Sequence, residues 1–409
     1  MKYKSVLCTA PFVSVVITPE RALRPCCKYS GDLGDLSKQT ITEILASDVV
    51  KDLQKDMYDN KWPDRAGPVG NCEECRLAEK IHSRSIRTAY IPGGTSYFND
   101  WRNGKIRIIE ISSSNICNLS CAGCSTRFSS GWLKYAKVIE KNTDTEFYRD
   151  IIHESPIINP NNDLLIKNLS ELDLTHLNRV NIKGGEPLMN TDMLVALRYF
   201  DEINILHKLE IHMDTSGAVI IDKTINETIA LLCKAKRIIF GLSVDGPDEV
   251  TTYIRYSPKN MASLDNIRNF ISVFEKNNIT FMVSPTIMVY NIFSLDRLVE
   301  WWLYDITPSF NHLDLDIYLF NFLIGPDYLS LQALQPATIS RLIDHYNNIV
   351  ETKEYGHWFS HLPDALENIE YSGNKLHNQM VKYTLDMDKI KGQSIYKSIP
   401  ELTNEMCYL

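Results

Sequence analysis

The sequence predicts an α/β protein in which a parallel sheet follows a cysteine-rich segment and precedes a helical segment. Between residues 101 and 325, apolar runs typical of strands alternate with helical segments, which is the pattern of parallel α/β sheets. The first 100 residues hold five of the ten cysteines. After about residue 325 the alternation stops and amphipathic helical periodicity takes over. We therefore expect three domains, at 1–100, 101–325 and 326–409.

Composition narrows the class of protein. The 409 residues are 44% hydrophobic and 23% charged, as in ordinary soluble proteins. A net charge of −8 argues against nucleic-acid binding, which needs a basic face. No apolar run approaches the roughly 20 residues that span a bilayer, and the N-terminus has no usual signal-peptide cleavage site. We expect a cytoplasmic protein without membrane contact. In a reducing cytosol, eight cysteines in two close-spaced groups indicate metal binding.

The first cysteine group begins on a predicted hairpin. An apolar strand follows Cys8, and after a polar turn the chain returns to Cys26 and Cys27. A helix is predicted over 41–58, and the pair Cys72 and Cys75 comes after it. Such an arrangement can close a four-thiolate site, and zinc and an iron–sulfur cluster both satisfy it.

The second group is the C-x₃-C-x₂-C loop of Cys117, Cys121 and Cys124, directly after a strand predicted at 106–112. A 4Fe-4S cluster needs four ligands, so three thiolates leave one iron open to a substrate or cofactor. A closed zinc site needs a fourth Cys or His, and none lies nearby in the sequence.

A glycine motif ends the next strand, predicted at 178–183. Gly184 and Gly185 let the backbone approach a ligand closely, and the carboxylate of Glu186 can accept a hydrogen bond from an ammonium group. The alternative is an ordinary strand-to-helix turn with Pro187 at the first helical position.

The remaining predicted strands end in small polar residues. These ends carry Ser216 with Asp214, Ser243 with Asp245, and Asn291. A polar turn is one interpretation of the first pair, and a helix N-cap is one interpretation of Asn291. These strands are expected at 208–214, 237–244, 279–289 and 313–320, and the helices between them at 190–206, 222–235, 263–277 and 294–303.

Several other features have plainer interpretations. The long segment 125–177 is slightly favoured as a peripheral insertion over a substrate lid. Cys233 is expected in the core, and His212 as a structural histidine. Cys407 is interpreted as a surface thiol, ahead of a late cluster ligand or a substrate-site thiol.

Three of these motifs together resemble the radical S-adenosylmethionine (radical SAM) family. They are CNLSCAGC, GGEP and SVDG, each at a strand end and in the family's order. One departure is Gly123, which stands where the family has an aromatic residue against the adenine. The resemblance implies a partial (β/α)₆ TIM-like barrel with ligands at the carboxyl ends of its strands.

The resemblance also implies roles for residues. Cys117, Cys121 and Cys124 would hold a 4Fe-4S cluster whose open iron binds S-adenosylmethionine. The cofactor would then be contacted by the GGEP motif at its amino group, and Arg255 would bind its carboxylate or order the SVDG loop. The contacts expected on this basis are Gly184, Gly185, Glu186, Pro187, Ser216, Ser243, Asp245, Arg255 and Asn291.

The N-terminal pattern C…PF…RPCC…C-x₂-C…E…S-x-R resembles the twitch domain, a short relative of the SPASM iron–sulfur domain, here placed before the barrel. Arg21 replaces the usual turn glycine. The resemblance implies an auxiliary 4Fe-4S cluster, either fully ligated or open to substrate. Its expected ligands are Cys8, Cys26, Cys72 and Cys75, with Cys27 as the competitor of Cys26.

The implied enzyme cleaves S-adenosylmethionine reductively to a 5′-deoxyadenosyl radical that abstracts hydrogen from a substrate C–H bond. An electron donor such as flavodoxin or ferredoxin would supply the electron. The preferred substrate is a peptide that is oxidised, crosslinked or epimerised, and the alternative is dehydrogenation or rearrangement of a small metabolite. No catalytic side chain is assigned. From another class, the rival is a zinc-stabilised binding protein without catalysis.

Overall fold

The computed structural model describes residues 6–64, 70–82, 85–90, 101–112, 114–142, 146–152, 157–159, 161–275, 278–323 and 325–406. Cys407 lies outside these residues. The chain divides into two compact units, which are considered separately below. Unit 1 comprises 1–115, 157–213 and 223–238, and unit 2 comprises 116–156, 214–222 and 239–409.

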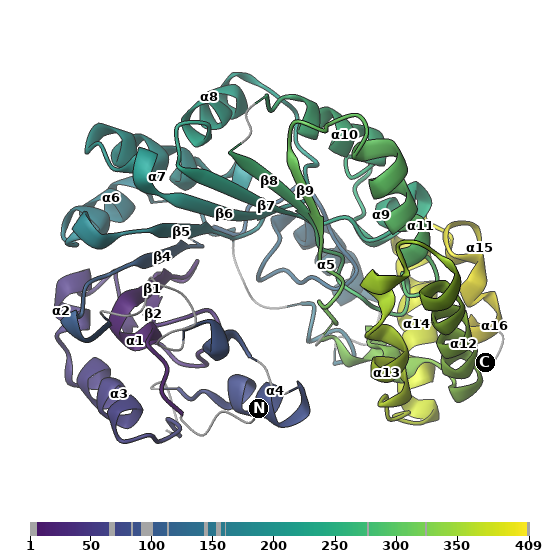
Figure 1. Ribbon diagram of the computed structural model, residues 1–409. Helices are drawn as coiled ribbons and strands as arrows, with labels where there is room; N and C mark the ends of the chain where they lie inside the picture. Colours follow the sequence, from purple (N-terminus) through teal and green to yellow (C-terminus); the bar gives the residue numbers. More distant parts are fainter. Residues whose placement is uncertain are drawn as a thin grey trace. The chain divides into compact units, whose positions relative to one another are not determined.

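The strands form one open sheet in the order β3-β2-β1-β4-β5-β6-β7-β8-β9 (Figure 1). All six predicted strands are present, each within the predicted range or one residue beyond it. Parallel pairing is in register from Ile111 to Ile182 and from Ile182 to Met213. The six strands are β4 (Ile108–Ile111), β5 (Arg179–Ile182), β6 (Glu210–Thr215), β7 (Arg237–Leu242), β8 (Ile279–Val283) and β9 (Asp314–Ile317).

The predicted N-terminal hairpin is confirmed and also extends the sheet. Strand β1 (Ser14–Ile17) pairs antiparallel with β2 (Ala22–Arg24), which pairs with β3 (Gly34–Asp35). On its other side β1 runs parallel to β4. Arg21 adopts the left-handed conformation, with φ of 65°, that a glycine would favour at this position of the turn.

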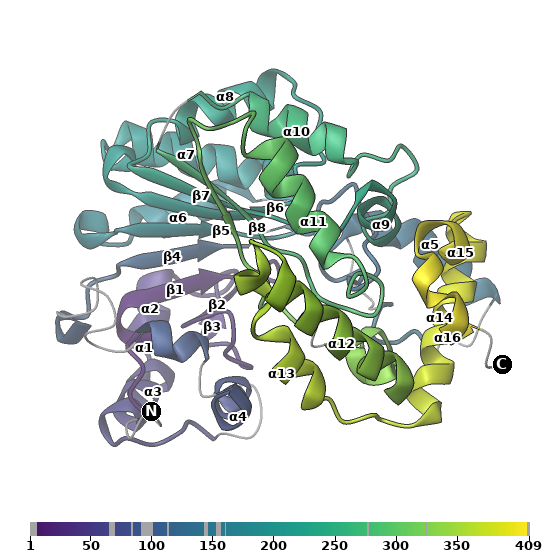
Figure 2. The same ribbon diagram turned by 45° about the vertical axis from the view of Figure 1, so that its right-hand side comes forward.

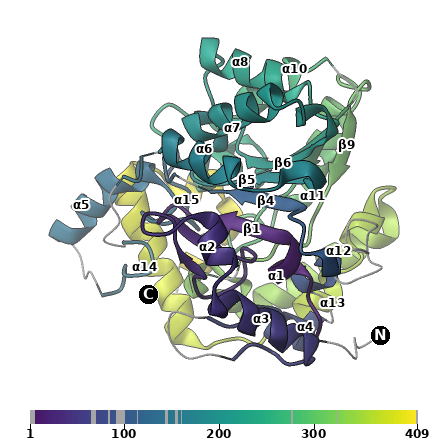
Figure 3. The same cartoon turned by 90° about the vertical axis from the view of Figure 1, so that its left-hand side faces the viewer.

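In unit 1, helices α6, α7 and α8 lie in a row, each beside the next (Figure 3). The helix predicted at 41–58 is divided in two, because Ser47 has extended backbone angles and starts a second helix. A capping box of Thr40 and Glu43 begins the first. The helices of unit 1 are α1 (Ala10–Val13), α2 (Ile41–Leu45), α3 (Asp48–Tyr58), α4 (Glu73–His82), α6 (Asn162–Ser170), α7 (Thr191–Glu202) and α8 (Lys223–Leu232).

Unit 2 has a core in which aromatic rings from the sheet and helix α10 interlock. Phe240 stacks on Phe281 with ring centroids 5.0 Å apart, and Phe270 and Phe274 meet them edge-on or tilted. Helix α5 lies beside α14 (Figure 2). The helices of unit 2 are α5 (Leu133–Asn142), α9 (Asp248–Ile254), α10 (Leu264–Ser272), α11 (Leu295–Trp301), α12 (Pro336–Thr352), α13 (Leu362–Glu367), α14 (Asn374–Lys391), α15 (Ile395–Ser398) and α16 (Thr403–Met406).

The predicted helical segment after residue 325 is confirmed by α12 to α16. Among the described residues, no helix is both long and apolar enough to cross a membrane.

Candidate functional site

The loop of Cys117, Cys121 and Cys124 belongs to unit 2, and its backbone is held by hydrogen bonds. The N–H of Leu119 donates to Cys117 Sγ at 3.5 Å, and the indole of Trp132 donates to the Cys121 carbonyl at 3.0 Å. All three cysteines are half-buried. The loop therefore presents three thiols from a fixed backbone, as a cluster site requires.

Burial raises the pKa of the Cys121 and Cys124 thiols, that of Cys124 to about 12. Positive charges from Arg255 and Lys391 oppose that rise for both. Burial also lowers the pKa of Lys391 to about 7, against the pull of the two thiols. Thiolates in this place need cationic partners, and the irons of a cluster supply such charge when bound.

Arg255 faces the cysteine loop. Its Nε lies 2.8 Å from Asp245 Oδ2 in a buried ion pair, and its Nη1 lies 4.0 Å from Cys121 Sγ. Asp245 Oδ1 also accepts from the backbone N–H of Thr286 at 2.9 Å. Of the two roles expected for Arg255, these contacts are those of a residue that orders the SVDG loop.

The other polar strand ends of unit 2 make local contacts. Ser216 Oγ accepts from the N–H of Ala218 at 3.2 Å, as in a polar turn. Asn291 is fully buried, and its amide donates to the Thr286 carbonyl at 3.0 Å. The N-cap alternative for Asn291 is wrong, because helix α11 begins after Ser294. The N–H of Ser243 donates to the Thr215 carbonyl at 2.9 Å.

The space at Gly123 is filled by two apolar side chains of unit 2. A Cβ added there would meet Leu323 Cδ1 at 3.0 Å and Met288 Cε at 3.6 Å. These aliphatic groups lie where the side chain of a larger residue 123 would begin.

The GGEP motif lies in unit 1, at the carboxyl end of β5 beside the end of β4. Gly184 has a φ of +121°, and a Cβ on it would lie 2.7 Å from the Ser114 carbonyl oxygen. The N–H of Gly185 donates to that same carbonyl at 3.1 Å. Glu186 is buried, and its Oε1 accepts from the N–H of Leu188 at 3.3 Å. Gly184 is thus required for the close approach of the two strand ends.

In the cysteine-rich segment of unit 1, four thiols influence one another's charge. Burial raises the pKa of Cys8 and of Cys72, each to about 12, and neighbouring thiols raise them further. Burial and the thiols of Cys8, Cys27 and Cys75 raise the pKa of Cys26 as well. Cys75 is buried in the first turn of α4, three residues after Cys72. The four thiols chosen from the sequence are therefore near enough for their charges to influence one another.

Cys27 has different surroundings. It is exposed, and the charges that act on its thiol, besides that of Lys28, come from Glu110 on β4 and Lys183 at the end of β5. Burial, ahead of Glu110, raises its pKa to about 11. The thiol of Cys26 is therefore influenced by Cys8 and Cys75 as well as by Cys27, whereas Glu110 and Lys183 influence that of Cys27.

Three residues of the N-terminal pattern were quoted in the sequence motif without a role. They are Glu79, Ser85 and Arg87, the E…S-x-R of the motif. Arg87 donates to Glu79 through Nε at 2.7 Å and to the Leu7 carbonyl through Nη1 at 3.1 Å, and Ser85 Oγ donates to Glu79 at 2.6 Å. This cluster ties helix α4, which carries Cys75, to the chain just before Cys8.

Among the residues that the structure describes, no three His, Cys, Asp or Glu side chains are grouped tightly enough to hold one metal ion. Their geometry therefore favours neither zinc nor an iron–sulfur cluster at the two cysteine groups. The donor set, of thiols in groups of three and four, is the chemistry that iron–sulfur clusters use.

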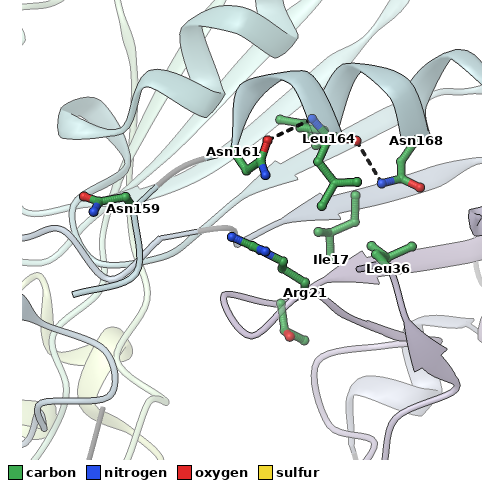
Figure 4. A pocket seen from close by; sticks show the side chains of 9 residues that line it. Ile17, Arg21, Leu36, Asn159, Asn161, Leu164 and Asn168 are labelled. Atoms are coloured by element: carbon green, nitrogen blue, oxygen red, sulfur yellow. Dashed lines mark hydrogen bonds between the residues drawn. The ribbon is translucent and has the colours of Figure 1, made fainter. Parts of the chain in front are cut away.

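A small pocket of unit 1 lies between the hairpin turn and helix α6 (Figure 4). Asn161 Oδ1 accepts from the N–H of Leu164 at 3.0 Å, and Asn168 donates to the Leu164 carbonyl at 2.8 Å. Arg21 also lines the pocket. It contains none of the predicted site residues, and we assign it no role.

Comparison with known proteins gives two family matches. Residues 111–287 match the model of the radical SAM superfamily, and residues 8–76 match that of an iron–sulfur cluster-binding domain, SPASM. The first match contains the second cysteine group and both downstream motifs. The second contains Cys8, Cys26, Cys72 and Cys75. No curated protein matches the chain.

Solved structures align only distantly. One is native anSMEcpe with bound AdoMet, at 15% identity and a TM-score of 0.38, covering 61% of this chain and 67% of the other. Another is Streptococcus suis SuiB bound to S-adenosylmethionine, at 14% identity and a TM-score of 0.34, covering 69% of this chain and 59% of SuiB. We draw nothing about function from likenesses at this level. By these two matches, the chain is an enzyme with a radical SAM domain at residues 111–287 and an N-terminal SPASM/twitch-type iron–sulfur domain at residues 8–76, and its cofactors are S-adenosylmethionine and 4Fe-4S clusters.

Proposed function

We propose that Cys117, Cys121 and Cys124 hold the radical SAM cluster and leave one iron for S-adenosylmethionine. The observation that carries the proposal is the hydrogen-bonded C-x₃-C-x₂-C loop, with its cysteines half-buried beside Arg255. When bound, the cluster supplies the electron that cleaves the sulfonium C–S bond of the cofactor. The protein's own residues hold the cofactor and keep water away from the radical.

The cofactor contacts are proposed as the sequence suggested. Glu186 accepts from the methionine amino group, in a turn whose glycines permit a close approach. Arg255, already paired with Asp245, orders the loop after β7. Leu323 and Met288 replace the missing aromatic side chain at residue 123 as the apolar surface for adenine. The contacts that complete the proposed set are Gly184, Gly185, Pro187, Ser216, Ser243 and Asn291.

We further propose that Cys8, Cys26, Cys72 and Cys75 hold the auxiliary cluster as its four ligands. The effect of these thiols on one another's pKa supports this choice. The charges of Glu110 and Lys183, which act on Cys27, also support it. A cluster with four protein ligands has no iron open to substrate, so its role is structural or in electron transfer. The proposed domains are the auxiliary-cluster domain at residues 1–100, the radical SAM partial barrel at 101–325 and the C-terminal helical cap at 326–409.

The proposed substrate is a peptide, from which hydrogen is abstracted on the way to oxidation, crosslinking or epimerisation. The resemblance of the N-terminal domain to twitch and SPASM domains supports it, since relatives with these domains mostly modify ribosomally made peptides. Dehydrogenation or rearrangement of a small metabolite is the second candidate. A reduced flavodoxin or ferredoxin would donate the electron, in the cytoplasm.

Anaerobic reconstitution tests the core of the proposal. After iron and sulfide are added, we expect about eight irons per chain, four for each of two clusters. With reductant and S-adenosylmethionine, 5′-deoxyadenosine should form. A variant with Cys121→Ala and Cys124→Ala is the control and should form none. A colourless protein without iron and without cleavage would instead support a zinc-stabilised binding protein.

A further inference from the structure

Helix α14, far from the cysteine motif in sequence, reaches the cluster loop inside unit 2. Tyr383 and Lys391 stand about two helical turns apart on this helix, and both are buried. The Tyr383 hydroxyl donates to the Ala122 carbonyl at 3.0 Å. The Lys391 ammonium donates to the Ser120 carbonyl at 2.8 Å. These two carbonyls belong to the residues on either side of Cys121.

The backbone on both sides of Cys121 makes hydrogen bonds through its N–H groups and its carbonyls. The N–H groups of Ser120 and Ala122 donate to the carbonyls of Tyr256 and Ile254, at 2.9 and 2.8 Å. The carbonyl of the residue between them accepts from Trp132. Helix α14 completes the set by binding the two remaining carbonyls. Buried backbone groups without partners cost free energy, so these two side chains stabilise one loop conformation.

Lys391 also brings a charge into this place. Its Nζ lies 4.0 Å from the centroid of the Trp132 ring, with the rings of Tyr256 and Tyr135 at 5.6 and 5.7 Å. Aromatic faces favour a cation. A buried cation is costly unless a negative group lies near it, and a thiolate-bound cluster would supply that negative charge. Cys121 is among the groups that act on the Lys391 ammonium.

We propose that Tyr383 and Lys391 are positioning residues of the radical SAM cluster, and that the Lys391 charge makes this cluster easier to reduce. The inference rests on the proposed function, because it needs a cluster on the Cys117 to Cys124 loop. A reduced cluster carries one more negative charge than an oxidised one. A cation nearby stabilises the reduced state and so raises the reduction potential.

The charge is tested with Lys391→Met, which keeps the length of the side chain and removes its charge and its hydrogen bond. Lys389→Met is the matched control, because Lys389 is exposed on the same helix. The measurement is an anaerobic redox titration followed by electron paramagnetic resonance, using the signal that responds to S-adenosylmethionine. We expect a more negative midpoint potential for Lys391→Met and an unchanged one for Lys389→Met. Equal potentials in all three proteins would overturn the role of the charge.

The hydrogen bond is tested separately with Tyr383→Phe, which removes only a hydroxyl. Tyr371→Phe is the control. The Tyr371 hydroxyl donates a hydrogen bond to Asn374, the first residue of α14, at an exposed position. Iron should leave the reconstituted Tyr383→Phe variant about 10-fold faster on chelator challenge. A rate of iron loss from Tyr383→Phe equal to that of wild type would refute the positioning role. This test does not depend on whether Lys391→Met folds. A wild-type protein without any cluster signal that responds to S-adenosylmethionine would refute the proposed function itself.

Discussion

Cys26 and Cys27 are neighbours in the sequence, and a one-residue difference decides which thiol enters the auxiliary site. The charged and thiol groups around them differ: Cys8, Cys27 and Cys75 act on the thiol of Cys26, and Glu110, Lys183 and Lys28 act on that of Cys27.

The first prediction follows from this difference. Cys26→Ala removes a ligand, and we expect the reconstituted protein to lose up to the four irons of one cluster. Cys27→Ala should keep the wild-type iron content. Iron and sulfide per chain measure both. A loss of iron in Cys27→Ala with full content in Cys26→Ala would reverse the assignment.

Gly123 allows a second prediction at the scale of single residues. Restoring the aromatic residue with Gly123→Phe should weaken S-adenosylmethionine binding, because Leu323 already occupies the adjoining space. Overpacking of this kind costs about 1–3 kcal/mol. In the double variant with Leu323→Ala, binding should recover in part. Calorimetric titration of the reconstituted proteins with the cofactor checks both, and tight binding by the single variant would contradict the packing argument.

At the scale of elements, two short segments are held in place by contacts with a neighbouring part of unit 1. Helix α4 carries Cys75, and the buried pair of Glu79 and Arg87 fixes this helix to the backbone before Cys8. The turn after β5 is held by contact with the end of β4. In both places a loss of local structure displaces residues of a candidate site.

Stability of helix α4 should therefore depend on pH. Burial raises the pKa of Glu79, but hydrogen bonds from Arg87 and Ser85 outweigh it and the pKa is lowered. A depressed pKa contributes stability above the ordinary glutamate value of about 4.3, and this contribution disappears as the pH falls through the folded value. Hydrogen exchange of α4 should rise over that range in wild type. The rise should be absent in Glu79→Gln.

Removing the partner cation gives a larger effect. We expect Arg87→Met to destabilise the fold by roughly 3–5 kcal/mol, since it leaves a buried carboxylate without its counter-ion. Arg76→Met, on helix α4, is the control. Its pair with Glu73 is exposed and should be worth about 1 kcal/mol or less. Urea denaturation of both variants measures the difference, and equal losses would contradict the argument from burial.

The turn after β5 is tested by Gly184→Ala. The added Cβ would collide with the Ser114 carbonyl oxygen at 2.7 Å, and the backbone has a positive φ that alanine avoids. Gly104→Ala is the matched control, because Gly104 also has a positive φ of 64° but no atom within 4 Å of the added Cβ. Backbone strain alone costs about 1–2 kcal/mol, so Gly184→Ala should lose clearly more stability. Thermal unfolding compares them.

For the whole molecule, sequence patterns predicted what depends on local periodicity. The six strands were predicted because apolar residues alternate within each, although the ranges were too long where polar turns follow, as after Val283. The break at Ser47 was missed, since its residues are compatible with a continuous helix. The parallel pairing of β1 with β4 was also missed, because pairing between distant segments leaves no local pattern.

Some residues of the candidate site were likewise predictable from the sequence, and others were not. Cysteine spacing and the GGEP motif are visible in the sequence because their chemistry fixes residue types. Lys391 and Tyr383 were not predicted, because a lysine near the end of an amphipathic helix usually faces solvent. Only the folded unit shows that both bind the loop of Cys121, across more than 250 residues of chain.

The final prediction separates the two cysteine groups within one protein. If the auxiliary cluster has four protein ligands, Cys72→Ala with Cys75→Ala should lose about four irons and still cleave S-adenosylmethionine, provided the chain folds. Cys121→Ala with Cys124→Ala should also lose about four irons, but cleave none. Iron content and 5′-deoxyadenosine formation, measured on the same preparations, distinguish them. Equal cleavage by both variants would mean that the cofactor is not bound at the Cys117 to Cys124 loop, and the assignment of the two sites would be wrong.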